Sequence, residues 1–418
     1  MTQKRTGKMI MLIMLAASCL FTGICSLWTP WVQAHSRHDN WLRDLDLVAK
    51  ELPKRHKNLF FQLDPATFYE GIESIKAQVD HRTDEELTMD LSRLIAAVGD
   101  GHTVVYPRFS TIYPIRLYWF KEGIYAFDAS MDYKEVVNLR LESLNGIPLD
   151  EVTNILRAAI AHDNEANFKS LVTNYMVIPE VLRGLGIAND PAVTMGFLDD
   201  EGDTVEATIY PKMIPDVAYM HSFARAKDVP LYMQNPGLYY WYTYIPEHEI
   251  VYFQYNVCAN MPEQSFKAFN QELFDCIETN GAKGLVIDLR NNGGGNSQVM
   301  SPFIKRLKKS SLNDPGKLFV IIGRSTFSSA LLNALELKRS TKATFVGEPT
   351  GGKPNHYGEV KQLHLPNTGI TIGYSTKYFI NSQEDLPSML PDVTIEPSFV
   401  AFVNGQDPVL DWVLQHIQ

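Results

Sequence analysis

The last third of the chain alternates short apolar runs with amphipathic stretches. The runs VYFQYNV, GLVIDL, KLFVIIG and ATFVGE are almost purely apolar, which is typical of strands buried on both faces. Between them, residues 262–279, NSQVMSPFIKRL and residues 327–338 have helical spacing, and DPVLDWVLQHI adds a closing helix. The pattern predicts an α/β domain over residues 236–418.

The first part of the chain has the helical period instead. WLRDLDLVAKEL places its apolar residues on one helix face. Thr83 and Glu86 have the spacing of a capping box before a second apolar stripe, and Gly99 stands where a helix would end. We expect a helical N-terminal region over residues 38–105.

The middle of the chain, residues 106–235, is richer in strand signals. IRLYWF, IYAFDA and VVNLRLESL are expected strands, and DPAVTMGFLDDEGDTVEATIYP is an expected hairpin. The turn Asn145-Gly146 precedes LDEVTNILRAAI, which has a helical pattern. We therefore expect a small β-rich module inserted between the helices and the α/β domain.

The N-terminal segment has the order of a secretory signal. MTQKRTGK carries three basic residues and no acid, residues 9–28 carry no charge, and Val32-Gln33-Ala34 ends in small-residue form. Residues 1–34 are therefore expected to direct export to the extracellular space or cell envelope. The apolar run is also long enough to span a bilayer, so an uncleaved anchor is the alternative.

Composition narrows the classes of partner. The formal net charge is −10, and cleavage after Ala34 removes three basic residues to give −13. Nucleic acid is therefore not an expected partner, and membrane contact is expected only through the N-terminal segment. Cleavage leaves Cys258 and Cys276, which a predicted helix of ~20 Å separates, too far for a disulfide. Two free, buried thiols are expected.

Three polar loops follow the predicted strands of the α/β domain: RNNGGGN, RSTFSSA and PTGGKPNHYGE. The carboxyl ends of such strands share one edge of the sheet, where ligands bind. Ser325 or Thr326 suits the cap of the following helix, and Ser328 its first turn. A first-turn serine is also well placed as a nucleophile, although capping alone explains such clusters more often.

A nucleophilic serine needs a base, and three residues qualify. Lys353 lies in the next loop, His102 follows a glycine-flanked helix end, and His356 is the third. Gly293-Gly294-Gly295 could supply backbone N–H groups to an oxyanion, or could be a plain turn. It lacks the spacing of a phosphate-binding loop. No set of residues has metal-ligand spacing, and no cofactor is implied.

Taken together, GLVIDLRNNGGG, TFSSALLNAL and VGEPTGGK resemble the tail-specific, or C-terminal processing, serine peptidases. That family includes the tricorn-type core and the repeats of interphotoreceptor retinoid-binding protein. GDGHT matches the family's upstream block, and LRLESLNGIPLDEV resembles the strand–turn–helix of a degenerate PDZ module. The resemblance implies a multidomain α/β fold with a crotonase/Clp-protease-like catalytic core and a PDZ-like insert.

The resemblance also implies roles for residues. Its nucleophile lies 25 residues before the lysine of the third block, which makes Ser328 the nucleophile. The base is Lys353 in the processing branch and His102 in the tricorn-type branch. The oxyanion hole falls on the N–H of Ser329 with that of Gly294 or Gly295. Beside what the resemblance implies, Glu359 is a candidate to assist a Ser328–His102 pair, and His356 remains a candidate supporting residue. The implied activity is cleavage of polypeptides, including unfolded chains or C-termini, through an acyl-enzyme.

Two positions depart from the family pattern. Ser-Ala-Leu follows Ser328 where the family usually has Ala-Ser-Glu, and Tyr357 replaces a glutamine. The departures favour His102 slightly over Lys353 as the base. They also leave a non-catalytic protein that binds a peptide or small apolar ligand as the alternative. An acyl-CoA enzyme on the same core is a weaker third reading, because export argues against it.

Overall fold

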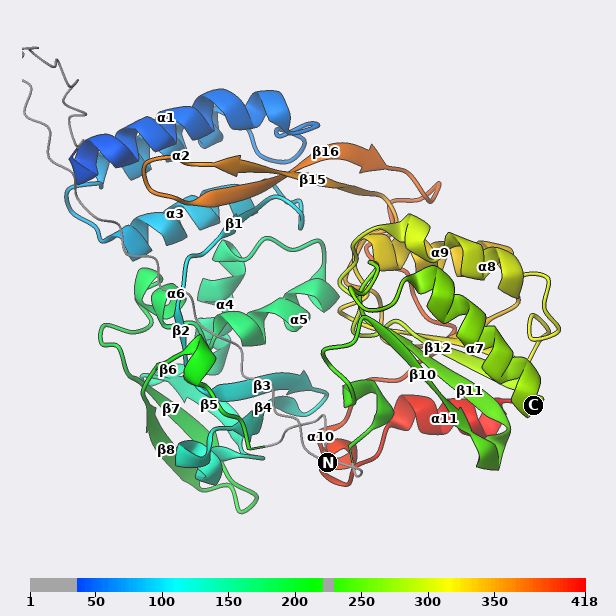
Figure 1. Cartoon of the computed structure of the whole chain (residues 1–418). Coiled ribbons are helices and arrows are strands. Elements are labelled where there is room, and N and C mark those ends of the chain that lie inside the picture. The colour runs from blue at the N-terminus through cyan, green and yellow to red at the C-terminus, as the bar shows by residue number, and fades with distance from the viewer. Residues whose placement is uncertain (1–35, 221–228) are drawn as a thin grey trace, which may run out of the picture. The chain divides into compact units, whose positions relative to one another are not determined.

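The computed structural model describes residues 36–220 and 229–418 (Figure 1). The predicted signal or anchor, residues 1–34, lies outside the described residues. Arg37–Gln418 form one compact unit. No helix in the described ranges has both the length and the apolar character needed to cross a membrane.

A six-stranded sheet forms the centre of the C-terminal part. Its order is β10-β11-β12-β13-β14-β17, in which β10 is antiparallel and the others are parallel. The strands are β10 (Tyr240–Ile245), β11 (Ile250–Tyr255), β12 (Gly284–Asp288), β13 (Leu318–Ile322), β14 (Thr344–Gly347) and β17 (Val393–Thr394). A helix separates each successive pair of strands from β11 to β14, so the predicted alternation of strands and helices is confirmed.

Helices cover both faces of this sheet. Successive side chains of a strand point to opposite faces, so each strand contributes side chains to two apolar cores. Phe253, Ile287 and Val320 belong to the apolar core formed with α7, α8 and α9. Tyr252 and Val286 belong to the core formed with α11. The covering helices are α7 (Phe266–Asn280), α8 (Ser301–Leu307), α9 (Ser329–Ser340) and α11 (Pro408–His416). The result is a three-layer α/β arrangement.

The middle of the chain forms a second, antiparallel sheet with helices against it. Its strands are β3 (Ile115–Phe120), β4 (Gly123–Ala129), β5 (Arg140–Leu144), β6 (Ile147–Pro148), β7 (Val193–Leu198) and β8 (Thr204–Ile209). The hairpin predicted over residues 190–211 is confirmed as β7–β8. Its helices are α4 (Leu149–Ala159), α5 (Glu165–Tyr175) and α6 (Pro179–Gly184). Only α4 was predicted, so this part is more helical than expected.

The N-terminal helices are α1 (Arg37–Arg55), α2 (Pro65–Ala77) and α3 (Asp84–Ala96). The capping box of Thr83 and Glu86 is confirmed at the start of α3. A three-stranded sheet lies beside these helices in Figure 1: β1 (Val104–Tyr106), β15 (His356–His364) and β16 (Thr371–Phe379). The β15–β16 hairpin thus leaves the C-terminal sheet and completes the N-terminal apolar core.

One buried carboxylate ties this hairpin to α1. Asp44 accepts hydrogen bonds from the backbone N–H of Asn367 (3.1 Å) and of Thr368 (2.6 Å), and from both of their side chains. Asp44→Ala leaves these donors without their acceptor, and we expect the free energy of unfolding to fall by about 2–4 kcal/mol. Urea unfolding measures this loss.

The matched control is Asp46→Ala, which removes an exposed carboxylate of the same helix that pairs with Lys76. An exposed ion pair contributes at most about 1 kcal/mol. An equal loss of unfolding free energy in the two variants would show that the hydrogen bonds of Asp44 contribute no more to stability than an exposed ion pair does.

Candidate active site

The three polar loops predicted to share one edge of the sheet do meet there. The N–H of Phe327, after β13, donates to the carbonyl of Asn292, after β12, at 3.1 Å. The N–H of Gly352, after β14, donates to the carbonyl of Thr326 at 3.3 Å. The loop that carries Ser328 therefore lies between the other two.

Ser328 occupies the turn between β13 and α9 with φ = 51° and ψ = −124°. A positive φ costs energy for a residue with a Cβ, and such residues cluster at functional sites. Ser328 is half-buried and is the N-cap residue of α9, but its side chain makes no capping hydrogen bond. Its hydroxyl is thus not used to start the helix.

The prediction that Ser325 or Thr326 caps α9 was wrong. The helix begins at Ser329, and Ser328 precedes it. The Thr326 hydroxyl accepts from the N–H of Gly323 (3.0 Å) and donates to the carbonyl of Leu289 (2.9 Å). Thr326 therefore stabilises the loop across β12 and β13, because its side chain points into the sheet edge rather than toward the helix.

The glycine run packs directly against the Ser328 turn. Gly294 has φ = 113°, and a Cβ there would lie 2.8 Å from the Cβ of Ser328 and 3.0 Å from the N of Ser329. The N–H of Gly294 donates to the side-chain oxygen of Asn292 at 2.9 Å. Of the two glycines proposed for the oxyanion hole, Gly295 is therefore the one whose N–H has no acceptor among the described residues.

Two buried residues that were not predicted to belong to the site, Asn292 and Cys258, support the glycine run. Asn292 is fully buried and donates from its side chain to the carbonyl of Tyr255 at 2.9 Å. Cys258 forms a β-bridge with Gly295. Both cysteines are free, as predicted, although Cys276 is only partly buried. Burial raises the pKa of Cys258 to about 11, so its thiol is a packing group rather than a nucleophile.

His102 lies next to the residue that precedes Ser328. Its ring stacks on Phe327 with centroids 4.4 Å apart, and on the ring of His356 at 5.7 Å. The residue is 7% exposed, and neither ring nitrogen has a hydrogen-bond partner among the described residues. Burial lowers the pKa of His102 to about 4, so the imidazole is neutral at pH 7 and able to accept a proton.

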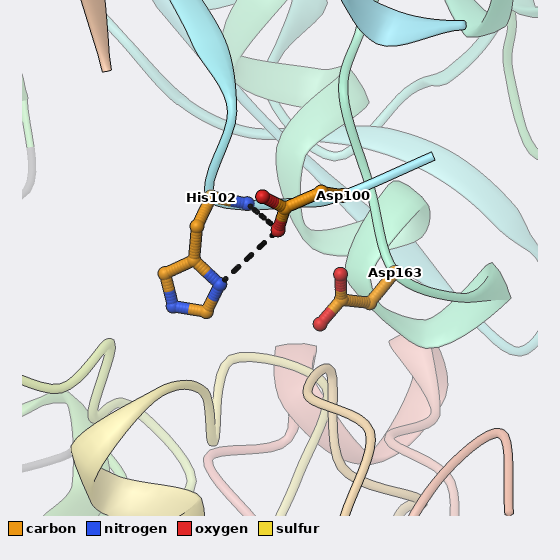
Figure 2. Close-up of side chains that lie close together, drawn as sticks. All are labelled: Asp100, His102 and Asp163. Carbon is orange, nitrogen blue, oxygen red and sulfur yellow. Dashed lines mark hydrogen bonds and ion pairs between the residues drawn. The ribbon is translucent and has the colours of Figure 1, made fainter. Parts of the chain in front are cut away.

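Two carboxylates face His102, as Figure 2 shows. One atom each of Asp100, His102 and Asp163 lie within 4.8 Å of one another, a separation that hydrogen bonds or a small cation could bridge. Asp100 Oδ1 lies 3.8 Å from His102 Nδ1. Burial and the charge of Asp100 raise the pKa of Asp163 to about 7. Neither carboxylate was predicted to belong to the site, and Asp163 comes from a different part of the chain.

Lys353 also lies beside the Ser328 loop. A Cβ on the preceding residue, Gly352, would lie 3.5 Å from the N of Ser328. The Lys353 side chain is partly exposed, and its Nζ lies 3.3 Å from the carboxylate of Asp385. The Lys353 ammonium thus points toward an exposed carboxylate of another loop.

The two supporting candidates lie on β15 rather than in a strand-end loop. The Nδ1–H of His356 donates to the carbonyl of Lys353 at 2.7 Å, and its ring stacks beside that of His102. Glu359 is exposed and has φ = 58° in the strand. The structure thus brings His356 next to His102, whereas no contact of the Glu359 side chain with the other candidate residues is found within the described ranges.

Two arginines hold the loops in place and were also missed; Arg324 is buried and Arg290 is partly buried. Arg290 pairs with Asp288 at 2.8 Å and with Asp407, at the start of α11, at 2.8 Å. Arg324 pairs with Glu348 and donates to the carbonyl of Trp119 in β3 at 2.6 Å. Their ion pairs hold the ends of β12 and β13 in place.

The low pKa of His102 has a consequence for stability. A folded-state pKa of about 4, below the ordinary 6.5, means that the stabilising contribution is present above pH 6.5 and is lost as pH falls through 4. Between pH 7 and pH 5 we expect this histidine alone to remove about 2 kcal/mol from the free energy of unfolding.

Urea unfolding of the wild type and of His102→Gln at the two pH values measures this effect. The pH-dependent loss is expected to be smaller in His102→Gln by that amount. His81→Gln, which replaces an exposed histidine, should keep the wild-type pH dependence. An unchanged dependence in His102→Gln would show that His102 is not held neutral by burial.

The sequence of this chain is similar to that of known peptidases. Residues 250–313 match the profile described as Peptidase family S41. A carboxyl-terminal-processing protease of Synechocystis sp. is 26% identical over 155 residues, which cover 32% of this chain and 35% of that protein. The matched segment thus spans about a third of this curated relative. The matches confirm the resemblance to the C-terminal processing peptidases.

The structures of mature CPAF are similar over most of the chain. CPAF complexed with lactacystin has a TM-score of 0.65 at 15% identity, covering 90% of this chain and 98% of that chain. Mature CPAF has a TM-score of 0.63 at 14% identity, covering 90% and 96%. At this level of identity the similarity shows the fold alone, a multidomain α/β architecture.

Proposed function

We propose that this chain is an exported serine endopeptidase that cleaves polypeptides through an acyl-enzyme on Ser328. The observation that carries the proposal is the strained turn at Ser328. The glycine run packs against this turn, and the ring of the preceding residue, Phe327, stacks on the buried ring of His102. The family match and the curated relative support the same reaction class. Export rests on the N-terminal sequence alone.

The first step assigned to this site is attack by Ser328 Oγ on a peptide carbonyl. His102 takes the hydroxyl proton and later gives it to the leaving amine, in the role of general base and then acid. The Nδ1 of His102 faces Asp100 (Figure 2), which leaves Nε2 on the other side of the ring for this transfer. A neutral buried imidazole meets the requirement.

The developing oxyanion is assigned to backbone N–H groups. Ser329 follows the nucleophile at the start of α9, where the helix dipole favours negative charge. Gly295 supplies the second N–H, and Gly294 leaves room because any side chain there would meet Ser328. Water then attacks the acyl-enzyme with His102 again as base, which releases the second product.

The remaining parts are assigned by their place around this site. The three-layer domain corresponds to a crotonase/Clp-protease-like core, and β3–β8 with α4 correspond to a PDZ-like module. Such a module would recruit unfolded chains or C-termini. No cofactor takes part in the proposed reaction, and the location is extracellular or in the cell envelope.

Covalent labelling tests the proposed nucleophile directly. The wild-type protein is incubated with a serine-directed fluorophosphonate, and the modified peptide is identified by mass spectrometry. We expect one modified residue, Ser328, and loss of labelling when an unfolded protein substrate is in excess. A chain that binds peptide without reacting with the probe would instead be the non-catalytic binding protein.

A further inference from the structure

We propose that Asp163 is the positioning residue that accepts the Nδ1 proton of His102, and that it thereby links the middle module to the catalytic loops. The inference rests on the proposed peptidase function. Asp163 lies between α4 and α5, about 60 residues from His102 along the chain. Its carboxylate faces the His102 ring in Figure 2.

His102 and Asp163 both have buried hydrogen-bonding atoms for which the described part of the chain provides no partner. Both ring nitrogens of His102 and Oδ2 of Asp163 are buried without a partner among the described residues. An unpaired buried polar group costs about 1–3 kcal/mol, so such groups persist mainly where function needs them. A ring N–H donor and a carboxylate acceptor complement each other, and one ligand atom of Asp163 lies within 4.8 Å of one ring nitrogen of His102.

Both oxygens of the other carboxylate, Asp100, already accept hydrogen bonds. Asp100 Oδ1 accepts the backbone N–H of His102 at 2.9 Å. Its Oδ2 accepts from the Thr103 hydroxyl at 2.6 Å and is 3.1 Å from Nε2 of His56. Asp100 therefore fixes the shape of the loop, whereas Asp163 has an oxygen free for the His102 ring.

Asp163 also holds the loop that carries His102. Its Oδ1 accepts the N–H of Gly101 at 2.7 Å, and the backbone N–H of Lys353 stabilises its ionised form as well. The neighbouring Asn164 side chain donates to the carbonyl of Thr350 at 3.1 Å. The α4–α5 loop thus contacts both the His102 loop and the Lys353 loop, so movement of the middle module would change the position of the base.

Ionisation of Asp163 selects the tautomer of His102. An ionised carboxylate accepts Nδ1–H and leaves Nε2 free to take the Ser328 proton, whereas a protonated one would donate to Nδ1. The charged or titratable groups around the pair are Asp100, Lys353, His56 and His356. Because burial raises the pKa of Asp163 to about 7, kcat/KM should rise with one deprotonation near neutral pH.

The test is Asp163→Asn, measured with an unfolded protein substrate. The amide keeps the shape but presents N–H to Nδ1, so we expect kcat to fall about 10²–10⁴-fold, KM to stay nearly unchanged and the neutral-pH limb to disappear. Nitrogen-15 NMR of the His102 ring should show a change from the Nδ1–H to the Nε2–H tautomer. Asp150→Asn, an exposed change in α4 of the same module, should match the wild type.

Two results would overturn the proposal. One is an Asp163→Asn protein with wild-type kcat and pH profile and an unchanged His102 tautomer. The other is cleavage that is lost in a chelator and restored by zinc in the wild type but not in Asp163→Asn, since the cluster would then serve a cation. The NMR measurement does not depend on cleavage, so failure of the peptidase function itself remains distinguishable.

Discussion

Ser328→Ala is expected to abolish peptide cleavage, with kcat reduced about 10⁴–10⁶-fold, while the protein remains folded. The hydroxyl oxygen is the attacking atom, and among the described residues its side chain makes no capping bond that could account for the serine structurally. Alanine keeps the Cβ and hence the same positive φ, so we expect the free energy of unfolding to change by no more than about 0.5 kcal/mol. Cleavage of an unfolded protein, followed by gel electrophoresis, and urea unfolding measure the two effects.

Ser325→Ala is the matched control, because Ser325 lies in the same loop three residues before Ser328 and is also partly buried. It should cleave like the wild type. Equal rates for Ser328→Ala and the wild type would exclude the proposed mechanism. A large loss of unfolding free energy in Ser328→Ala would instead show that the hydroxyl stabilises the folded protein.

The second large effect distinguishes the two candidate bases. We expect His102→Gln to lose about 10²–10⁴-fold in kcat, since a general base contributes that much and glutamine cannot take the proton. Lys353→Met should lose less than about tenfold. The reason is that His102 is buried and neutral next to the Ser328 loop, whereas Lys353 is partly exposed and paired with Asp385.

Single-turnover cleavage by the two variants at pH 7 gives the comparison, and Asp385→Asn adds a check on the lysine. If Lys353 were the base, freeing it from Asp385 would change the pH profile strongly, and Lys353→Met would be the inactive variant. A wild-type profile in Asp385→Asn, together with an inactive His102→Gln, is the result that we expect.

The sequence predicted those features that depend on local pattern. Apolar runs such as GLVIDL and KLFVIIG identify strands buried on both faces, and the rule for strand ends then collects the loops of Gly294, Ser328 and Lys353 at one edge. The capping box of Thr83 could be predicted for the same reason, because all its hydrogen bonds lie within four residues.

Features that depend on long-range packing were not predictable in this way. The partners of Asp163 and Arg324 come from segments far away in the sequence, and no periodicity indicates them. Only the first residues of β15 were predicted, as the end of the loop PTGGKPNHYGE, and no strand was predicted for the rest of the β15–β16 hairpin. Polar residues such as Lys361 and Gln362 break the apolar pattern, because β15 is buried on only part of its length. The cap of α9 was misplaced because Thr326 bonds across the sheet instead of along the chain.

The β15–β16 hairpin sets the order in which the protein can mature during synthesis. Asp44 in α1 and its hydrogen-bond donor Thr368 are 324 residues apart, and β1 pairs with β16 rather than with a strand near it in sequence. The N-terminal helices that precede His102 share their apolar core with residues 363–374, so that core is complete only after almost the whole chain has left the ribosome. Because His102 lies between α3 and β1, its position is expected to be fixed only after β16 has been synthesised.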